Sequence, residues 1–218
     1  DVNIVVEVMG GVGKAREYVL DALNGGKTVV TSNKERVCKY SHELERAAKH
    51  HNAGLYFEAS CVGGVPIIRT LIDGMQANVV HSLTGIINGT TNYILTRMTR
   101  EGLGFDEVLR EAQALGYAEK DPTADVGGFD AAYKLSIFAA LAVHTKGPLE
   151  KVYREGIRGI SSLDIAYGEE LGYVLKLLAI GKNDGGGKVE VRVHPAFIRK
   201  EHPLASVNDS FNAVFLQG

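Results

Sequence analysis

The alternation of strand-like and helix-like stretches over the first 60 residues constrains the fold of this chain more than any other feature. The β-branched run "IVVEV", "TVVTS" and "LYFEAS" read as strands, and helical stretches separate them from residue 14 and from residue 35 onward. This alternation predicts a parallel sheet with right-handed crossovers. Because the first strand opens the sequence with nothing before it, we expect the chain to begin inside a domain.

Beyond residue 60 the pattern changes. "GGVPIIRTLIDG" predicts a helix with Pro66 just inside its start, "NVVHSLTGIIN" predicts a strand, and helical stretches follow from residues 89 and 105 and from Phe129 to about His144. Valines at alternate positions from 189 to 193 indicate one arm of a hairpin around a glycine-rich turn. We expect an antiparallel or mixed sheet with helices on one face.

Charge and cysteine usage exclude several classes of protein. The formal charge is -2 without a run of basic residues, which disfavours a nucleic-acid partner. No segment approaches 18 uninterrupted apolar residues, so we expect no membrane span. Cys38 and Cys61 have neither metal-type nor redox-type spacing, which favours a reducing cytoplasm without disulfides.

Familiar catalytic motifs are missing from the sequence. It contains no GxGxxG, GxxxxGK[ST], HExxH or GxSxG, and "MGGVGK" fits neither type of phosphate loop. The seven histidines are scattered, which disfavours zinc, and His81 fits a structural histidine.

The segment "GYAEKDPTADVGGFDAAYK" concentrates charge at the start of a predicted helix. Asp130 and Lys134 are four residues apart and so share a helix face, which a helix-capping carboxylate and a surface ion pair would also explain. Glu119, Asp121 and Asp125 add like charges that a structural loop does not need. Carboxylates can hold a substrate ammonium while a lysine moves a proton to or from an oxygen, so the functional interpretation is a site for a small amino acid.

The same segment resembles the signature of the homoserine dehydrogenases. Gly116, Asp121, Asp125, Asp130 and Lys134 fall at the family's spacing, and "IVVEVMGG", "GKTVVTSNKE", "FEASCVGGVPII" and "GIINGTTNYIL" agree as well. The resemblance implies an α/β protein: a partial Rossmann-type nucleotide-binding domain with a parallel sheet over residues 1–57, and an α+β catalytic and dimerisation domain with a mixed sheet over residues 58–218. Against the family, both ends are expected to be truncated.

The resemblance also implies an activity: NAD- or NADP-dependent hydride transfer between L-homoserine and L-aspartate 4-semialdehyde in threonine, methionine and isoleucine biosynthesis, by a cytoplasmic homodimer. Hydride transfer leaves positioning and proton transfer to the protein. By match to the family, Lys134 is expected to act as the acid/base, together with Lys34. Substrate binding is expected of Gly116, Glu119, Asp125 and Asp130. Cofactor binding is expected of Gly10, Gly11 and Lys34. Lys34 could equally be a solvated lysine after a strand.

Two further segments carry expectations from the resemblance. "EASCVGGVP" resembles a loop that holds sodium, with Glu58, Cys61, Gly63 and Val65 at the matching positions and only the carbonyl of Cys61 serving as ligand. A tight turn between domains is the alternative. Thr90 and Asn92 in "NGTTN" match positions that face the substrate, although Thr90 could instead cap a helix.

Two other functions are compatible with the residues. One is a different Rossmann-type oxidoreductase acting on an amino-acid aldehyde, and the other is a non-catalytic fragment, because the phosphate loop is missing. The choice between NAD and NADP, and any fusion to an aspartate kinase or to an ACT-type regulatory domain, depends on residues outside this sequence.

Overall fold

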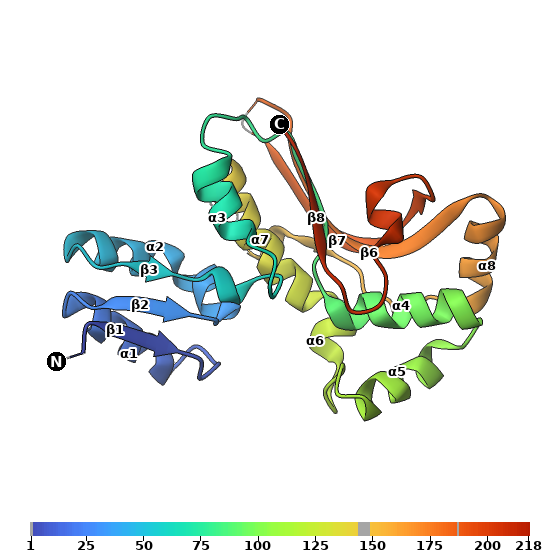
Figure 1. The fold of residues 1–218 in the computed structure, drawn as a ribbon, viewed down its shortest axis with the longest axis horizontal. Helices are drawn as coiled ribbons and strands as arrows, with labels where there is room; N and C mark the ends of the chain where they lie inside the picture. Colours follow the sequence, from blue (N-terminus) through green and yellow to red (C-terminus); the bar gives the residue numbers. More distant parts are fainter. Residues whose placement is uncertain (1, 144–148, 187) are drawn as a thin grey trace.

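The computed structural model describes residues 2–143, 149–186 and 188–218, and it contains two sheets (Figure 1). The smaller sheet has the order β1-β2-β3, with both neighbouring pairs parallel. The predicted parallel sheet is confirmed. Its strands and the two intervening helices are β1 (Ile4–Glu7), α1 (Lys14–Asn24), β2 (Thr28–Thr31), α2 (Lys34–His50) and β3 (Leu55–Tyr56).

Apolar side chains join the two helices to the smaller sheet. Val19 and Leu23 of α1, Leu44 of α2 and Val29 of β2 form one buried cluster. The third strand is shorter than predicted, because Glu58–Ser60 forms a turn of 3₁₀ helix instead of continuing the strand.

The larger sheet is mixed, as predicted, with the order β5-β7-β6-β4-β8. Among the pairs described within this larger sheet, β5–β7 is parallel and the others are antiparallel. The expected hairpin is β6 with β7, and its turn includes Gly187, which lies outside the described residues. The strands are β4 (Ser82–Ile86), β5 (Tyr153–Arg154), β6 (Tyr173–Asn183), β7 (Val189–Arg199) and β8 (Ala213–Gln217).

The remaining helices cluster around this larger sheet (Figure 1). The predicted helix at Pro66 begins one residue later and is short, and the helix predicted to reach His144 is described as far as Val143, His144 lying outside the described residues. The helical segments are α3 (Ile67–Arg69) with its π-helical continuation Thr70–Gly74, α4 (Gly89–Glu101), α5 (Phe105–Ala114), α6 (Thr123–Val126), α7 (Phe129–Val143), the 3₁₀ turns Leu149–Lys151 and Pro203–Ser206, and α8 (Ser162–Glu170).

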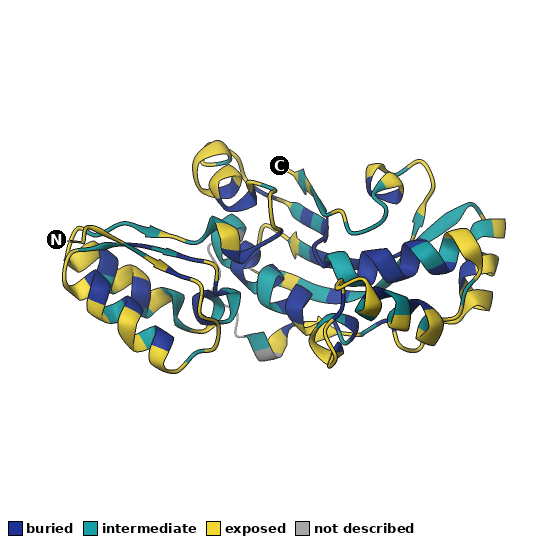
Figure 2. Ribbon diagram, turned by 60° about the horizontal axis from the view of Figure 1, so that its bottom comes forward, coloured by how far each residue is buried: buried dark blue, intermediate teal, exposed yellow. Residues whose placement is uncertain are grey.

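Helix α7 lies where the two parts of the molecule meet. It packs on β6 and β7 of the larger sheet and also contacts α2 beside the smaller one. Ala131, Leu135 and Phe138 of α7 are buried in the main core, and Figure 2 shows the buried residues concentrated between the helices and the larger sheet. The first turn of α7 is therefore held against the first turn of α2.

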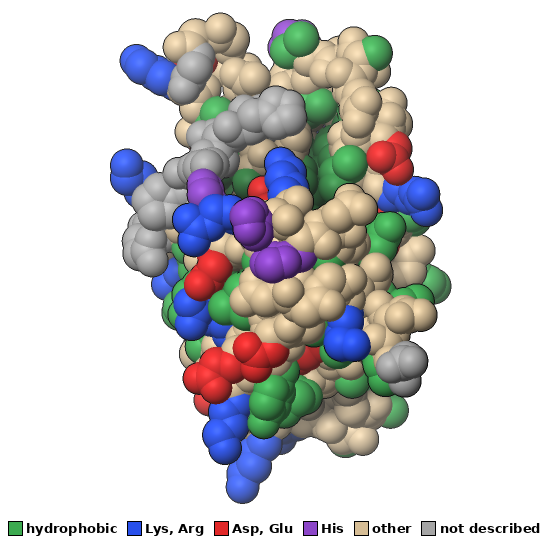
Figure 3. Space-filling model, turned by 90° about the vertical axis from the view of Figure 1, so that its left-hand side faces the viewer, with side chains coloured by type: hydrophobic (Ala, Val, Ile, Leu, Met, Phe, Trp, Pro, Cys, Tyr) green, Lys and Arg blue, Asp and Glu red, His purple; other side chains and the backbone are tan. Residues whose placement is uncertain are grey.

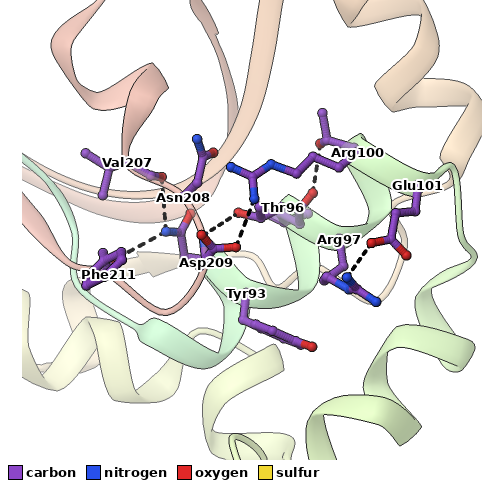
Figure 4. A network of polar contacts seen from close by, with 12 residues as sticks. Tyr93, Thr96, Arg97, Arg100, Glu101, Val207, Asn208, Asp209 and Phe211 are labelled. Atoms are coloured by element: carbon purple, nitrogen blue, oxygen red, sulfur yellow. Dashed lines mark hydrogen bonds and ion pairs between the residues drawn. The ribbon is translucent and has the colours of Figure 1, made fainter.

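Helix α4 is tied to the segment that follows the 3₁₀ turn Pro203–Ser206 (Figure 4). The Asp209 amide donates to Thr96 Oγ1 at 3.1 Å, and Arg100 Nη1 contacts Asp209 Oδ1 at 3.1 Å. These contacts tie the C-terminal half of α4 to Asp209.

No helix among the described residues is long and apolar enough to cross a bilayer. At the end of the molecule that carries the smaller sheet, Lys and Arg side chains are interspersed with Asp and Glu rather than gathered into one basic patch (Figure 3).

Candidate active site

A cavity of about 390 Å³ separates the smaller sheet from the acidic segment. Three stretches distant in the sequence line it: the turn after β1, the start of α2, and residues 119–133. Six of the ten residues predicted for catalysis, substrate binding or cofactor binding therefore come together here, and Lys134 is not among those that line the cavity. Those that line the cavity are Gly10, Gly11, Lys34, Glu119, Asp125 and Asp130, with Asn33, Asp121 and Tyr133 beside them.

Asp130 is the centre of the charged groups at this cavity. Its carboxylate is buried and lies between two ammonium groups, with Lys34 Nζ at 2.9 Å from Oδ1 and Lys134 Nζ at 2.6 Å from Oδ2. The predicted contact between Asp130 and Lys134 across one helical turn is confirmed. The lysines differ in access, because 40% of the Lys34 side chain is exposed at the cavity whereas Lys134 is 14% exposed and also donates to the Ile87 carbonyl at 2.9 Å.

A buried asparagine links Asp130 to the second carboxylate of the cavity. Asn88 Nδ2 donates to Asp125 Oδ1 at 2.7 Å and to Asp130 Oδ2 at 2.9 Å. Its Oδ1 accepts from the amide and the hydroxyl of Thr91, so the same side chain caps α4. We call Lys34, Asn88, Asp125, Asp130 and Lys134 the carboxylate cluster.

The pKa values of the two acids in the carboxylate cluster are shifted in opposite directions. Burial acts to raise the pKa of Asp130, but Lys134 and Lys34 outweigh it and hold that pKa below its ordinary value. The pKa of Asp125 is raised, first by burial and then by the charge of Asp130, against the lowering effect of the Asn88 hydrogen bond. Burial acts to lower the pKa of Lys34, yet Asp130 raises it overall. Asp130 is therefore the harder of the two acids to protonate, and Asp125 the easier.

The glycine turn after β1 is held from below by α2. Asn33 Nδ2 and Arg36 Nη2 both donate to the Gly11 carbonyl, at 2.7 and 3.0 Å. Arg36 is fully buried and pairs with Glu7, whose other oxygen accepts from the Met9 amide at 2.7 Å. Gly10 and Gly11 have φ values of 73° and 70°, which side chains rarely adopt, and a Cβ on either would meet no atom within 4 Å. The turn thus offers bare backbone to the cavity.

The loop after α5 places Glu119 at the cavity wall. Gly116 adopts a φ of 81° just beyond the helix end, which explains a glycine there. Gln113 Nε2 donates to the Glu119 carbonyl at 3.1 Å, and Thr90 Oγ1 donates to the Tyr117 carbonyl at 2.6 Å. The Glu119 side chain is exposed at the cavity, whereas Gly116 does not line it.

Thr90 and Asn92 lie outside the cavity lining. Thr90 is not the helix cap, because Asn88 occupies that position and Thr90 instead supports the loop at Tyr117. Asn92 is buried, donates to the carbonyls of Val207 and Phe211 at 3.1 Å each, and accepts from Lys176 Nζ at 3.1 Å. The Asn92 side chain is thus engaged by the 207–211 segment, away from the cavity, and its expected contact with substrate stays a prediction.

The predicted cation loop is partly committed to other contacts. The Glu58 carboxylate accepts from the amides of Ile68 and Arg69 at 2.8 Å each and so caps α3. The Val65 carbonyl accepts from the Ile67 amide at 2.8 Å. Cys61 is buried, which raises the pKa of its thiol to about 11 and leaves a neutral group unsuited to a hard cation.

Sequence reasoning missed Asn88, Asn33 and Arg36. Asn88 and Asn33 each precede a helix and accept from its first amides, so an asparagine before a predicted helix start was the available signal. That signal indicates only a cap. The second contacts of these side chains, to Gly11, Asp125 and Asp130, depend on packing between distant segments.

Comparison with known proteins gives one consistent family. Residues 66–218 match the family model described as homoserine dehydrogenase, and residues 1–58 match that of the homoserine dehydrogenase NAD binding domain. The chain is 49% identical to the homoserine dehydrogenase of Synechocystis and 46% identical to that of Bacillus subtilis over its whole length. It covers 51% and 50% of those proteins, so it spans about half the length of the curated relatives that it matches.

Solved structures agree with this relationship. A homoserine dehydrogenase from Thiobacillus denitrificans superposes with a TM-score of 0.94 at 47% identity, covering 99% of this chain and 50% of that one. A hyperthermophilic archaeal homoserine dehydrogenase in complex with NADPH gives a TM-score of 0.83 at 32% identity, covering 98% of this chain and 61% of that one.

Proposed function

This chain belongs to the homoserine dehydrogenase family, and from that premise we propose that the complete protein containing it interconverts L-homoserine and L-aspartate 4-semialdehyde with a nicotinamide cofactor. The observation that carries the proposal is the convergence of Glu119, Asp125, Asp130 and Lys34 on one cavity beside the glycine turn. A purely structural ion pair would need neither the cavity nor the additional acids.

The residues around the glycine turn fit the cofactor. Gly10 and Gly11 present open backbone, and Asn33 and Arg36 hold the turn in place by its carbonyl. Lys34 follows β2 at the carboxyl edge of a parallel sheet, which is where such sheets bind ligands. When bound there, the nicotinamide would supply or accept the hydride at the substrate carbon.

The acids of the cavity suit the amino end of the substrate. We infer that Glu119 and Asp125 bind the substrate ammonium, because both line the cavity and neither carries an ion pair among the described residues. Asp130 already has two ammonium partners, so its proposed role is to hold the two lysines in place. The lysines in turn would bind the oxygen end of the substrate. Charge-assisted hydrogen bonds of this kind are stronger than neutral ones.

Proton transfer falls to the lysines. In the reducing direction, the carbonyl oxygen of the semialdehyde takes a proton as its carbon takes the hydride, and an ammonium group supplies that proton. We assign this step to Lys134 with Lys34 beside it. Both amino groups contact the Asp130 carboxylate, Lys34 at Oδ1 and Lys134 at Oδ2, and this carboxylate compensates their charge.

The experiment that tests the function is an assay of the complete gene product with L-homoserine and with NAD and NADP in turn, following formation of the reduced nicotinamide. We expect turnover with homoserine and none with serine or threonine. Absence of turnover with both cofactors, in a folded protein that binds neither, would reject the proposed function.

Several finer properties are part of the proposal. We propose that NADP is accepted, since a related archaeal enzyme is described in complex with NADPH, and that the enzyme works in the cytoplasm in threonine, methionine and isoleucine biosynthesis. We also propose a homodimer through the larger sheet. Phe215, 40% exposed, shares a face with Ile180, because both pair with Thr84. Sedimentation at micromolar concentration measures the dimer, and a monomer would contradict it.

Sodium is proposed as a ligand of the loop that follows β3. The backbone carbonyls of Cys61 and Gly63 would hold it. Replacing sodium by a bulky organic cation in the assay buffer should lower activity if the ion is needed. Equal activity in both buffers would remove sodium from the account.

A further inference from the structure

The second carboxylate of the cavity depends on a single polar partner. Among the described residues, Asn88 is the one side chain that donates a hydrogen bond to the Asp125 carboxylate, at 2.7 Å, whereas Asp130 has two lysines besides Asn88. Asp125 is half-buried and lines the cavity. An acid that is partly desolvated and close to another carboxylate tends to take up a proton unless something stabilises its charged form.

The orientation of the Asn88 amide follows from its surroundings. Its oxygen faces two donors, the amide and hydroxyl of Thr91, both at 2.9 Å, and its nitrogen faces two carboxylate oxygens. Turning the amide over would set oxygen against the acids and nitrogen against the donors. Helix α4 therefore fixes which end of Asn88 meets the acids.

We propose that Asn88 is a positioning residue that keeps Asp125 ionised and aimed into the cavity, so that Asp125 can bind the substrate ammonium together with Glu119. This inference rests on the proposed function. The Asn88 side-chain oxygen accepts from Thr91 at the start of α4, and its nitrogen donates to Asp125 and Asp130. This shared donor allows the two carboxylates to lie close together without a third cation. Lys134 and Lys34 are thereby left to Asp130.

Substitution at Asn88 separates capping from positioning. Serine and aspartate cap helices about as well as asparagine does, but serine lacks the amide donor and aspartate adds a third negative charge. We expect Asn88→Ser to raise KM for homoserine about tenfold or more and Asn88→Asp to raise it further, with little change in kcat for the serine variant. Thr91→Val is the matched control, because it removes the hydroxyl that contacts Oδ1 and the backbone carbonyl of Asn88 but leaves the Asn88 Nδ2 donor to the acids in place. Its KM should stay within about threefold of wild type.

A titration without substrate tests the same claim independently of activity. The titratable groups facing the acid pair are Lys34 of α2, Lys134 of α7 and Cys61 of the loop after β3. In carbon-detected NMR of labelled carboxyl groups, Asn88→Ser should move the midpoint of Asp125 upward by about one pH unit, since a hydrogen bond to the charged form is lost. The Thr91→Val midpoint should match wild type.

The outcomes distinguish the two proposals. Unchanged KM and an unchanged Asp125 midpoint in a folded Asn88→Ser protein would overturn the positioning role and leave Asn88 as a helix cap. A shifted midpoint in a protein that never oxidises homoserine would support the positioning of Asp125 and reject the proposed function instead. If Asn88→Ser fails to fold, the Asp125 midpoint of Asn88→Asp is compared with that of wild type in the same titration. A higher midpoint supports the positioning role, and an equal midpoint overturns it.

Discussion

Two buried polar clusters sit one helical turn apart on α4, and they differ in almost every property that matters for catalysis. At Asn88, the carboxylate cluster combines acids with lysines and opens on a cavity. At Asn92, the ammonium of Lys176 is 1% exposed and is held by three uncharged oxygens, from Asn92, Val207 and Asn208. We call this second group the lysine cluster.

If the carboxylate cluster is the active site, as we propose, then a perturbed pKa does not by itself mark one. Burial lowers the pKa of Lys176 to about 8. Yet Lys176 faces the interior, where it ties β6 to the 207–211 segment. What distinguishes the carboxylate cluster is compensated charge at an accessible surface, where a substrate can exchange with an existing partner.

The largest effect is expected from removing the central charge of the carboxylate cluster. Asp130→Asn keeps the shape of the side chain but leaves Lys34 and Lys134 without their shared anion. We expect kcat to fall by roughly 10² to 10⁴, the span typical of lost proton-transfer machinery. Steady-state kinetics on the complete protein measure it.

Asp121→Asn is the matched control for that variant. Asp121 lines the same cavity, but its carboxylate is held locally by Thr123, whose amide donates to it at 3.1 Å, and it forms no ion pair among the described residues. Its activity should stay within about threefold of wild type. Equal losses of kcat in the two variants would mean that the overall negative charge of the cavity, and not the contacts of Asp130, supports turnover.

A smaller effect is expected at the cavity wall. Glu119→Gln removes a charge that we assign to the substrate ammonium, so KM for homoserine should rise about 10- to 100-fold, as for a lost charge-assisted hydrogen bond, with a modest change in kcat. Glu35→Gln is the control, because Glu35 also lines the cavity but pairs with Lys39 at 2.6 Å. A raised KM in both variants, or in neither, would contradict the specific role of Glu119.

The smallest effect is expected at the lysine cluster, where substitution should change the free energy of unfolding and leave activity unaffected. Because the pKa of Lys176 is lowered in the folded state, the unfolded chain binds its proton more tightly, and folded stability gains as pH rises from about 8 toward 10.5. Relative to Lys176→Met, wild type should therefore gain roughly 1–2 kcal/mol in free energy of unfolding between about pH 7.5 and pH 9.5. Denaturant unfolding at both pH values measures the difference.

Lys182→Met controls that measurement, since Lys182 lies on the same strand and is exposed. Its stability difference from wild type should not change with pH over this range. A flat difference for Lys176→Met as well would show that the buried ammonium keeps an ordinary proton affinity.

The sequence anticipated the fold where a pattern is local. Strand and helix alternation from residue 1 to 60 and the pairing of β6 with β7 follow from periodicities that span a few residues. Helix α8 and strands β5 and β8 were not predicted. Strand β5 has only two residues and is ordered by its pairing with β7, so it has too little sequence to show a period.

In the site as well, contacts within one helix could be predicted from the sequence, whereas contacts between distant segments could not. Asp130 and Lys134 share a helix face, so four residues of spacing were enough to predict their contact. The contact of Lys34 with Asp130 was not predicted, because it joins helices 96 residues apart through packing between two sheets. Asn92 illustrates the converse: its position in a motif suggested the substrate, but the 207–211 segment occupies its side chain.

A paired lysine measurement tests the central claim most directly. Lys134→Met and Lys176→Met make the same substitution in the two clusters, and kcat for homoserine oxidation should fall by roughly 10² to 10⁴ in the first and stay within about threefold of wild type in the second, provided both proteins are folded. Near-normal turnover of folded Lys134→Met, or an equal loss in Lys176→Met, would contradict the assignment of catalysis to the carboxylate cluster.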